Sequence, residues 1–214
     1  MKLDPDLLAK AAGFERFEPI TIKRFEQYAA LLIETNSKIN LISRSVEPSI
    51  EIPNQIAISL IARRLCPPGS SSWIDIGSGG GFPVVPVAIA EPSIQFTAVE
   101  PTAKKAYFIE RTAQELGLEN LRVVVSRMEE FVDDKNDRQW NVVSIKAVTD
   151  LDRSLFWCSQ LLNSSGMAIT YKPNDVTPNE SLIIARHGFE HTCSLDVKEV
   201  IDTINLYVVA CKKR

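Results

Sequence analysis

Short runs rich in β-branched and aromatic residues alternate with helix-length segments along most of this chain, from Trp73 onwards. Such alternation is typical of a parallel sheet whose strands are joined by crossover helices. Only residues 201–204 separate the last two runs. Because that connection is too short for a crossover, we expect those two strands to pair antiparallel. The predicted strands are Trp73–Ile76, Ile94–Val99, Leu121–Val125, Asn141–Ile145, Met167–Tyr171, His191–Val200 and Asn205–Cys211.

The N-terminal part of the chain has helical periodicity instead. Apolar residues recur at helix spacing over Ile22–Leu32, and a second, less regular apolar run covers Ile50–Leu65. A cluster of helix-breaking residues follows at Cys66–Ser72. We therefore predict a helical appendage over residues 1–68 and a main domain over residues 69–214. The clearest predicted helices of the main domain are Ala103–Leu116, which Gly117 would cap, and Leu151–Leu162.

The composition is that of a globular protein without a membrane span. The chain has 214 residues, 45% of them hydrophobic, and a net charge of −3. It lacks both an 18-residue apolar run and an N-terminal signal core, so we expect a cytoplasmic protein. The four cysteines form no C-x-x-C pair, and the only histidines are His187 and His191. Since zinc sites need three or four ligands, no metal is expected.

Four of the nine glycines lie in one segment directly after the first predicted strand. Residues 75–83 read D-I-G-S-G-G-G-F-P. Glycine lets the backbone turn tightly and approach a ligand, and open α/β sheets bind ligands at the carboxyl ends of their strands. Glu100 directly follows the second predicted strand, 23 positions after Gly77. In nucleotide-binding folds an acidic residue about 20 positions after the glycine loop accepts hydrogen bonds from ribose hydroxyls. The glycine loop and Glu100 together therefore predict a nucleoside cofactor.

The glycine loop lacks the grip that phosphate-bearing cofactors need. Dinucleotide-binding loops follow G-x-G-x-x-G/A, but the sixth position from Gly77 is Phe82. No Lys follows the glycines, so the phosphate-binding G-x-x-x-x-G-K-[ST] loop is absent as well. S-adenosylmethionine contains a nucleoside and no phosphate, and it is therefore the expected cofactor. A nicotinamide oxidoreductase is disfavoured because Phe82 interrupts its loop.

Several segments of the chain carry a resemblance to one family: Asn36–Leu41, Ile74–Pro83, Glu100, Lys104–Lys105, Arg127–Phe131 and Lys146–Val148. In these segments the chain resembles the bacterial ribosomal RNA small-subunit methyltransferase G family, also called GidB. The resemblance implies a class I methyltransferase fold, which is Rossmann-like with a seven-stranded, mostly parallel sheet and an antiparallel last strand. It also implies methyl transfer from S-adenosylmethionine to N7 of a guanine in small-subunit (16S) ribosomal RNA.

Carried over position by position, the resemblance also implies roles for single residues. Lys146 stands where the family usually carries Arg, and it is the candidate catalytic residue at the carboxyl end of the fourth strand. Asn54, Gln55 and Ile58 are further departures from the family pattern. The residues implied to bind the cofactor are Gly77, Ser78, Gly79 and Phe82 in the loop, Glu100 at the ribose, and Met128 and Glu129 beside the adenine.

Attraction for RNA has to be local, because the net charge of −3 gives no global attraction for phosphate. The expected RNA-binding residues are Lys104, Lys105, Arg153 and Lys172. The predicted protein is a monomer that acts on small-subunit ribosomal RNA or on the assembled subunit. Two alternatives stay open at this point: a methyltransferase with another substrate, and a cofactor-binding, RNA-associated assembly factor without activity.

Overall fold

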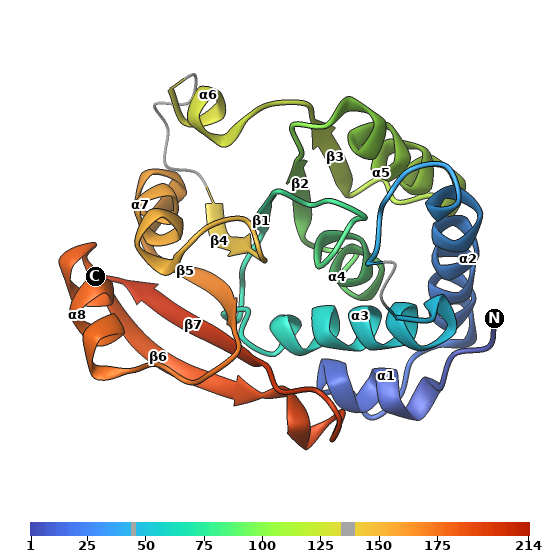
Figure 1. Ribbon diagram of the computed structural model, residues 1–214, viewed down its shortest axis with the longest axis horizontal. Helices are drawn as coiled ribbons and strands as arrows, with labels where there is room; N and C mark the ends of the chain where they lie inside the picture. Colours follow the sequence, from blue (N-terminus) through green and yellow to red (C-terminus); the bar gives the residue numbers. More distant parts are fainter. Residues whose placement is uncertain (44–45, 134–139) are drawn as a thin grey trace.

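The computed structural model describes residues 1–43, 46–133 and 140–214 (Figure 1). Its helices are α1 (Pro5–Ala12), α2 (Pro19–Asn36), α3 (Pro48–Arg63), α4 (Val84–Ala90), α5 (Ala103–Leu116), α6 (Met128–Asp133), α7 (Leu151–Leu161), α8 (Pro178–Arg186) and the 3₁₀ turn η1 (Val197–Glu199). Its strands are β1 (Ser72–Ile76), β2 (Gln95–Val99), β3 (Leu121–Val124), β4 (Trp140–Ile145), β5 (Leu162–Lys172), β6 (Phe189–Asp196) and β7 (Tyr207–Lys213).

The seven strands form one sheet in the order β3-β2-β1-β4-β5-β7-β6. Strands β1 to β5 pair in parallel, whereas β7 pairs antiparallel with both β5 and β6. The predicted sheet, with its antiparallel last strand, is confirmed. The strand order reverses between β1 and β4, which places a ligand-binding crevice at the carboxyl ends of these two strands.

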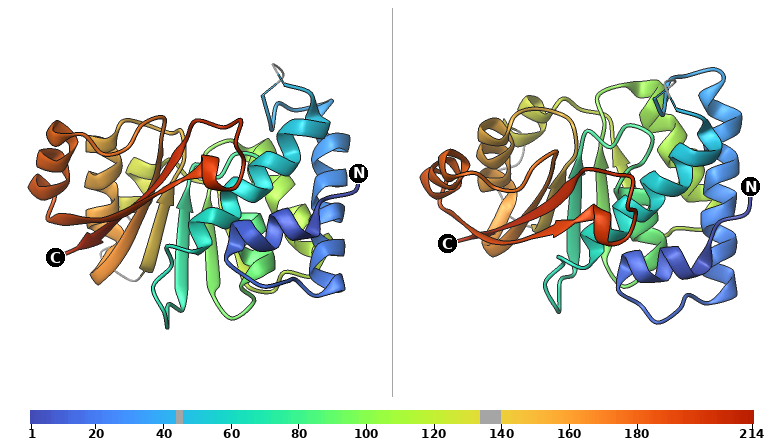
Figure 2. Two further views of the ribbon diagram at one scale, coloured as in Figure 1. Left: turned by 90° about the horizontal axis from the view of Figure 1, so that it is seen from below. Right: turned by 60° about the horizontal axis from the view of Figure 1, so that its bottom comes forward.

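Helices cover both faces of the sheet (Figure 2). Alternate residues of each strand point to opposite faces, so Trp73 of β1 joins one apolar core and Ile74 joins the other. The first core lies beneath α4 and α5 and contains Phe96; the second lies beneath α7 and contains Val143. The crevice is therefore held by strands that are buried on both faces.

The helices α1 to α3 pack into the first of these cores. Leu8, Phe25 and Ile56 belong to the same apolar cluster as Trp73 and Phe96. Helix α3 contacts α4, and α2 contacts both α4 and α5. The division into an appendage and a main domain at residue 68 stays a prediction. The N-terminal helices and the sheet bury their apolar side chains in the same core.

Several elements differ from the sequence prediction: β5 begins at Leu162 rather than at Met167, and β7 covers Tyr207–Lys213 rather than residues 205–211. The sixth strand covers Phe189–Asp196 rather than residues 191–200, because the Asp196 side chain accepts a hydrogen bond from the Lys198 N–H and starts the turn η1. Helix α8 was not predicted, although Thr177 and Glu180 form a capping box that marks its start. Within the described ranges, no helix is long and apolar enough to cross a bilayer.

Candidate functional site

Two cavities meet at Gly77, in the crevice at the carboxyl ends of β1, β2 and β4. The larger holds about 400 Å³ and the smaller about 210 Å³. All eight residues predicted to bind the cofactor or act in catalysis line one of them. The larger is lined by Gly77, Glu100, Met128 and Glu129, and the smaller by Gly77, Ser78, Gly79, Phe82 and Lys146.

The Glu100 carboxylate is fixed by the backbone at the wall of the larger cavity. Its Oε2 accepts a hydrogen bond from the Gly79 N–H at 2.9 Å, and its Oε1 accepts one from the Thr102 N–H at 2.9 Å. The residue is 4% exposed. An ionised carboxylate has about four acceptor positions, so each oxygen keeps capacity for a further donor. Glu100 thus presents a carboxylate of fixed orientation to the larger cavity.

Met128 and Glu129 form another wall of the larger cavity, at the start of α6. Met128 is 5% exposed and belongs to the second apolar core, so its side chain packs and lines the cavity at once. Glu129 is exposed, and its Oε1 pairs with the Arg153 guanidinium at 2.5 Å. The cavity therefore has an apolar wall beside an exposed ion pair.

Two glycines of the loop have left-handed backbone and different surroundings. Gly77 has φ +71°, and a Cβ there would lie 2.5 Å from a methyl group of Val148. Gly79 has φ +56°, and a Cβ there would meet only the Gly77 carbonyl oxygen, at 3.8 Å. Protein atoms thus fill the space beside Gly77, whereas the space beside Gly79 is open to a ligand.

Lys146 reaches the smaller cavity from the end of β4 and meets the appendage there. Its Nζ donates a hydrogen bond to Gln55 Oε1, and Gln55 Nε2 donates to Glu51 Oε1 at 2.9 Å. The ammonium lies 5.1 Å from the centroid of the Phe82 ring. Burial lowers the pKa of Lys146 to about 8, against the opposing effect of the Asp75 and Glu51 carboxylates. The smaller cavity therefore holds a cation that loses its proton near pH 8.

Asp75 lies fully buried beneath the glycine loop. Trp73 Nε1 donates to Ser144 Oγ at 2.8 Å, and Ser144 Oγ donates to Asp75 Oδ1 at 2.7 Å. In the part of the chain that the structure describes, Asp75 Oδ2 has no hydrogen-bond partner. Burial raises the pKa of Asp75 to about 7, although Ser144, Ser78 and Lys146 oppose the shift. A buried carboxyl group, one of whose oxygens has no hydrogen-bond partner among the described residues, thus lies directly beneath the glycine loop.

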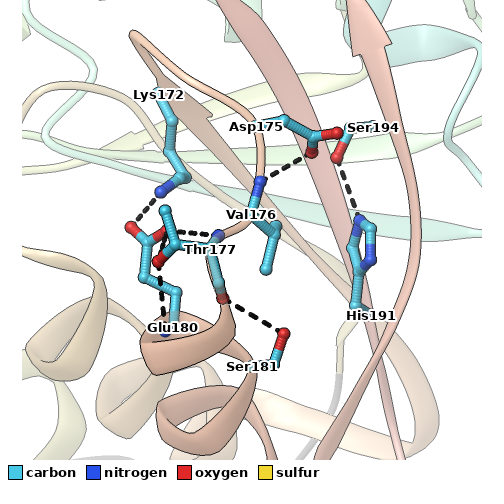
Figure 3. Close-up of polar contacts among 8 residues, drawn as sticks. All are labelled: Lys172, Asp175, Val176, Thr177, Glu180, Ser181, His191 and Ser194. Carbon is cyan, nitrogen blue, oxygen red and sulfur yellow. Dashed lines mark hydrogen bonds and ion pairs between the residues drawn. The ribbon is translucent and has the colours of Figure 1, made fainter.

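The residues predicted to bind RNA lie in different surroundings. Lys104 is exposed and Lys105 half-buried at the start of α5, and Arg153 lines the larger cavity. Lys172 pairs with Glu180, the acid of the α8 capping box (Figure 3). A contact between Lys172 and RNA would have to compete with that pair, so Lys104 has the freest side chain of the four.

Sequence reasoning missed the contribution of α3 to the site. Gln55 and Glu51 line the smaller cavity, yet their distance from Lys146 along the chain gives no signal of contact. Gln55 was singled out only as a departure from the family pattern. Asp75 was part of the recognised loop, but its burial and its unpaired oxygen depend on the packing of Trp73 and Ser144.

Tyr28 of α2 holds the glycine loop in place. Its hydroxyl donates to the Gly80 carbonyl oxygen at 2.6 Å, and both groups are buried. Tyr28→Phe leaves that carbonyl without its donor, and we expect the free energy of unfolding to fall by about 1–3 kcal/mol. Urea unfolding measures the change. The matched control is Tyr107→Phe, because Tyr107 is 67% exposed; equal stability losses in the two variants would contradict this role of Tyr28.

The strand order and the position of the crevice are those of a class I methyltransferase fold. Solved structures of methyltransferases share this fold with the chain. The 30S ribosomal A1408 methyltransferase from an uncultured bacterium (UncKam) matches with a TM-score of 0.54 and 18% identity, over 67% of this chain and 88% of that one. Geranyl diphosphate methyltransferase in complex with SAM matches with a TM-score of 0.51 and 18% identity, over 67% of this chain and 78% of that one.

The chain belongs to the GidB family, rRNA small subunit methyltransferase G, whose family model matches residues 21–195. One relative is the ribosomal RNA small subunit methyltransferase G of Trichormus variabilis. It is 38% identical over 162 residues, which cover 70% of this chain and 63% of that protein. The chain thus matches less than two thirds of the length of this relative. The family resemblance inferred from the sequence is confirmed.

Proposed function

We propose that this protein is an S-adenosylmethionine-dependent methyltransferase that modifies N7 of a guanine in small-subunit (16S) ribosomal RNA. The proposal is carried by the two cavities that meet at Gly77, one beside Glu100 and one beside Lys146. Membership of the methyltransferase G family supports the substrate class. A cytoplasmic location and action as a monomer stay predictions.

The residues of the crevice fit S-adenosylmethionine. Glu100 offers fixed acceptors to ribose hydroxyls, Met128 offers an apolar wall to the adenine ring, and the open space beside Gly79 permits close approach. When bound, the cofactor supplies a methyl group on a sulfonium. The residues that would hold it are Gly77, Ser78, Gly79, Phe82, Glu100, Met128 and Glu129.

The acceptor proposed here needs orientation rather than removal of a proton. Guanine N7 is a lone-pair nucleophile, so in-line positioning replaces general-base catalysis. Among the described residues, neither His nor Cys lines either cavity, whereas attack by carbon-5 of a pyrimidine would require a thiol nucleophile. We infer that Lys146 orients the target nucleotide by binding a phosphate or a base edge.

Small ribosomal subunits from cells that lack this gene provide the test. Incubated with the purified protein and labelled S-adenosylmethionine, they are expected to gain N7-methylguanine at a single position, which nucleotide mapping identifies. A parallel reaction with naked small-subunit RNA separates the two forms of substrate. A methylated amine or pyrimidine carbon would contradict the N7 assignment. Cofactor binding without any transfer would favour an assembly factor without activity.

A further inference from the structure

A groove outside the two cavities lies between the end of α2 and the first turns of α5. It holds about 390 Å³ and is lined chiefly by Lys38, Ile39, Lys104, Tyr107, Phe108 and Arg111. Phe108 is buried and forms part of the first apolar core, whereas Tyr107 is 67% exposed. The groove thus combines an apolar floor with an aromatic ring that is accessible to a partner.

The charges around this groove differ from those at the other cavities. Its lining has three cations and no acid, whereas each of the other four described cavities has at least one glutamate in its lining. Arg111 is compensated by acids outside the lining, because it pairs with Glu115 at 2.6 Å and lies within the electrostatic influence of Glu34, so the excess rests on the two lysines. Within the described residues, Lys38 and Lys104 form no ion pair. In a chain of net charge −3, such a local excess of cations favours an anionic partner.

Both walls of the groove are continuous along the chain with residues of the crevice, one at the smaller cavity and one at the larger. Ile39 lies two residues before Leu41, which lines the smaller cavity and abuts Gly80 of the loop. Ala103 and Lys104 follow Thr102, whose N–H holds the Glu100 carboxylate. These two links along the chain place the groove next to the crevice that would take the target nucleotide.

We propose that this groove binds an unpaired nucleotide of the substrate RNA near the target, with its base against the Tyr107 ring and its phosphates against Lys38 and Lys104. The proposal rests on the proposed function, and it specifies how the RNA is held beside the reaction site. Every base has a face that stacks on an aromatic ring, and lysine binds phosphate as a point charge, so the groove accepts single strands without reading their sequence.

Steady-state methyl transfer to small ribosomal subunits tests the groove. Tyr107→Ala is expected to raise KM for the subunit roughly 5- to 150-fold, with kcat and the calorimetric affinity for S-adenosylmethionine almost unchanged. Tyr107→Phe keeps the ring and is expected to behave like the wild type.

The phosphate contacts are tested by the double variant Lys38→Gln/Lys104→Gln. It is expected to bind the small subunit more weakly, with a smaller dependence of the affinity on salt concentration, because fewer counterions are released. Lys198→Gln on η1, also an exposed lysine, is the control.

Photo-crosslinking gives a readout that does not depend on activity. Irradiated complexes of the wild type with small ribosomal subunits are expected to yield a nucleotide attached to the peptide that contains Tyr107. An unchanged KM in Tyr107→Ala, with crosslinks elsewhere, would overturn the groove and leave the methyltransferase function intact. Equal losses in Tyr107→Ala and Tyr107→Phe would overturn stacking. If the wild type transferred no methyl group to RNA yet still crosslinked at Tyr107, the proposed function would fail and the groove would stand. If a protein of the subunit were crosslinked there instead, the RNA assignment would fail.

Discussion

Replacing Gly79 with arginine is expected to weaken S-adenosylmethionine binding by on the order of 100-fold or more. The arginine side chain would enter the open space beside the loop, within a cavity of only about 210 Å³. The φ of +56° adds strain, since side chains other than glycine rarely adopt it. Isothermal calorimetry with the purified variant measures the affinity.

Gly69→Arg is the matched control for this substitution. Gly69 also has a positive φ, +78°, and no atom lies within 4 Å of the position that a Cβ would take. Both variants therefore have comparable backbone strain, but only Gly79→Arg fills the crevice. Unchanged affinity in a folded Gly79→Arg protein would show that the cofactor lies elsewhere. Equal losses in both variants would indicate a general effect on the fold.

Lys146→Ala is expected to slow single-turnover methyl transfer by about 100-fold, because the target nucleotide loses its orientation. The affinity for S-adenosylmethionine is expected to stay within about threefold of the wild type, since pocket occupancy is a separate property. Lys146→Arg keeps the cation and adds a planar fork, so it is expected to retain activity. An unaffected alanine variant would remove Lys146 from the mechanism, and an inactive arginine variant would show that this chain requires the lysine geometry.

The pH dependence gives this prediction a second readout. Burial lowers the pKa of Lys146 to about 8, so the ammonium loses its proton at a lower pH than a free lysine. If the charged form orients the target, the rate falls as the pH rises above about 8. Lys146→Arg stays charged and is expected to abolish that fall. The groups facing Lys146 are Asp75, Glu51, Gln55 and the Phe82 and Tyr171 rings. A decline that persists in the arginine variant would show that the titrating group is not Lys146.

The sequence predicted those parts of the protein that depend on short-range patterns. Alternating strand and helix segments predicted the seven-stranded sheet, and the spacing of Gly77 and Glu100 brought two segments to one crevice. Contacts between distant segments have no such pattern. The hydrogen bond from Lys146 to Gln55 joins residues far apart in the chain. The pairing of Lys172 with Glu180 depends on α8, a helix that was not predicted although its capping box is present in the sequence. Charge alone therefore did not separate the exposed Lys104 from the engaged Lys172.

The hydroxyl of Tyr28 and the backbone of Leu41 both touch the glycine loop, which has a consequence for how such proteins can diversify. A substitution that changes the conformation of the loop also changes the surface against which the N-terminal helices pack. A change in those helices likewise alters the loop. Recombination that exchanged the helical segment between relatives would separate partners that have adapted to each other. Chimeras that carry Tyr28, Leu41 and residues 77–83 from one parent are therefore the ones expected to inherit a working crevice.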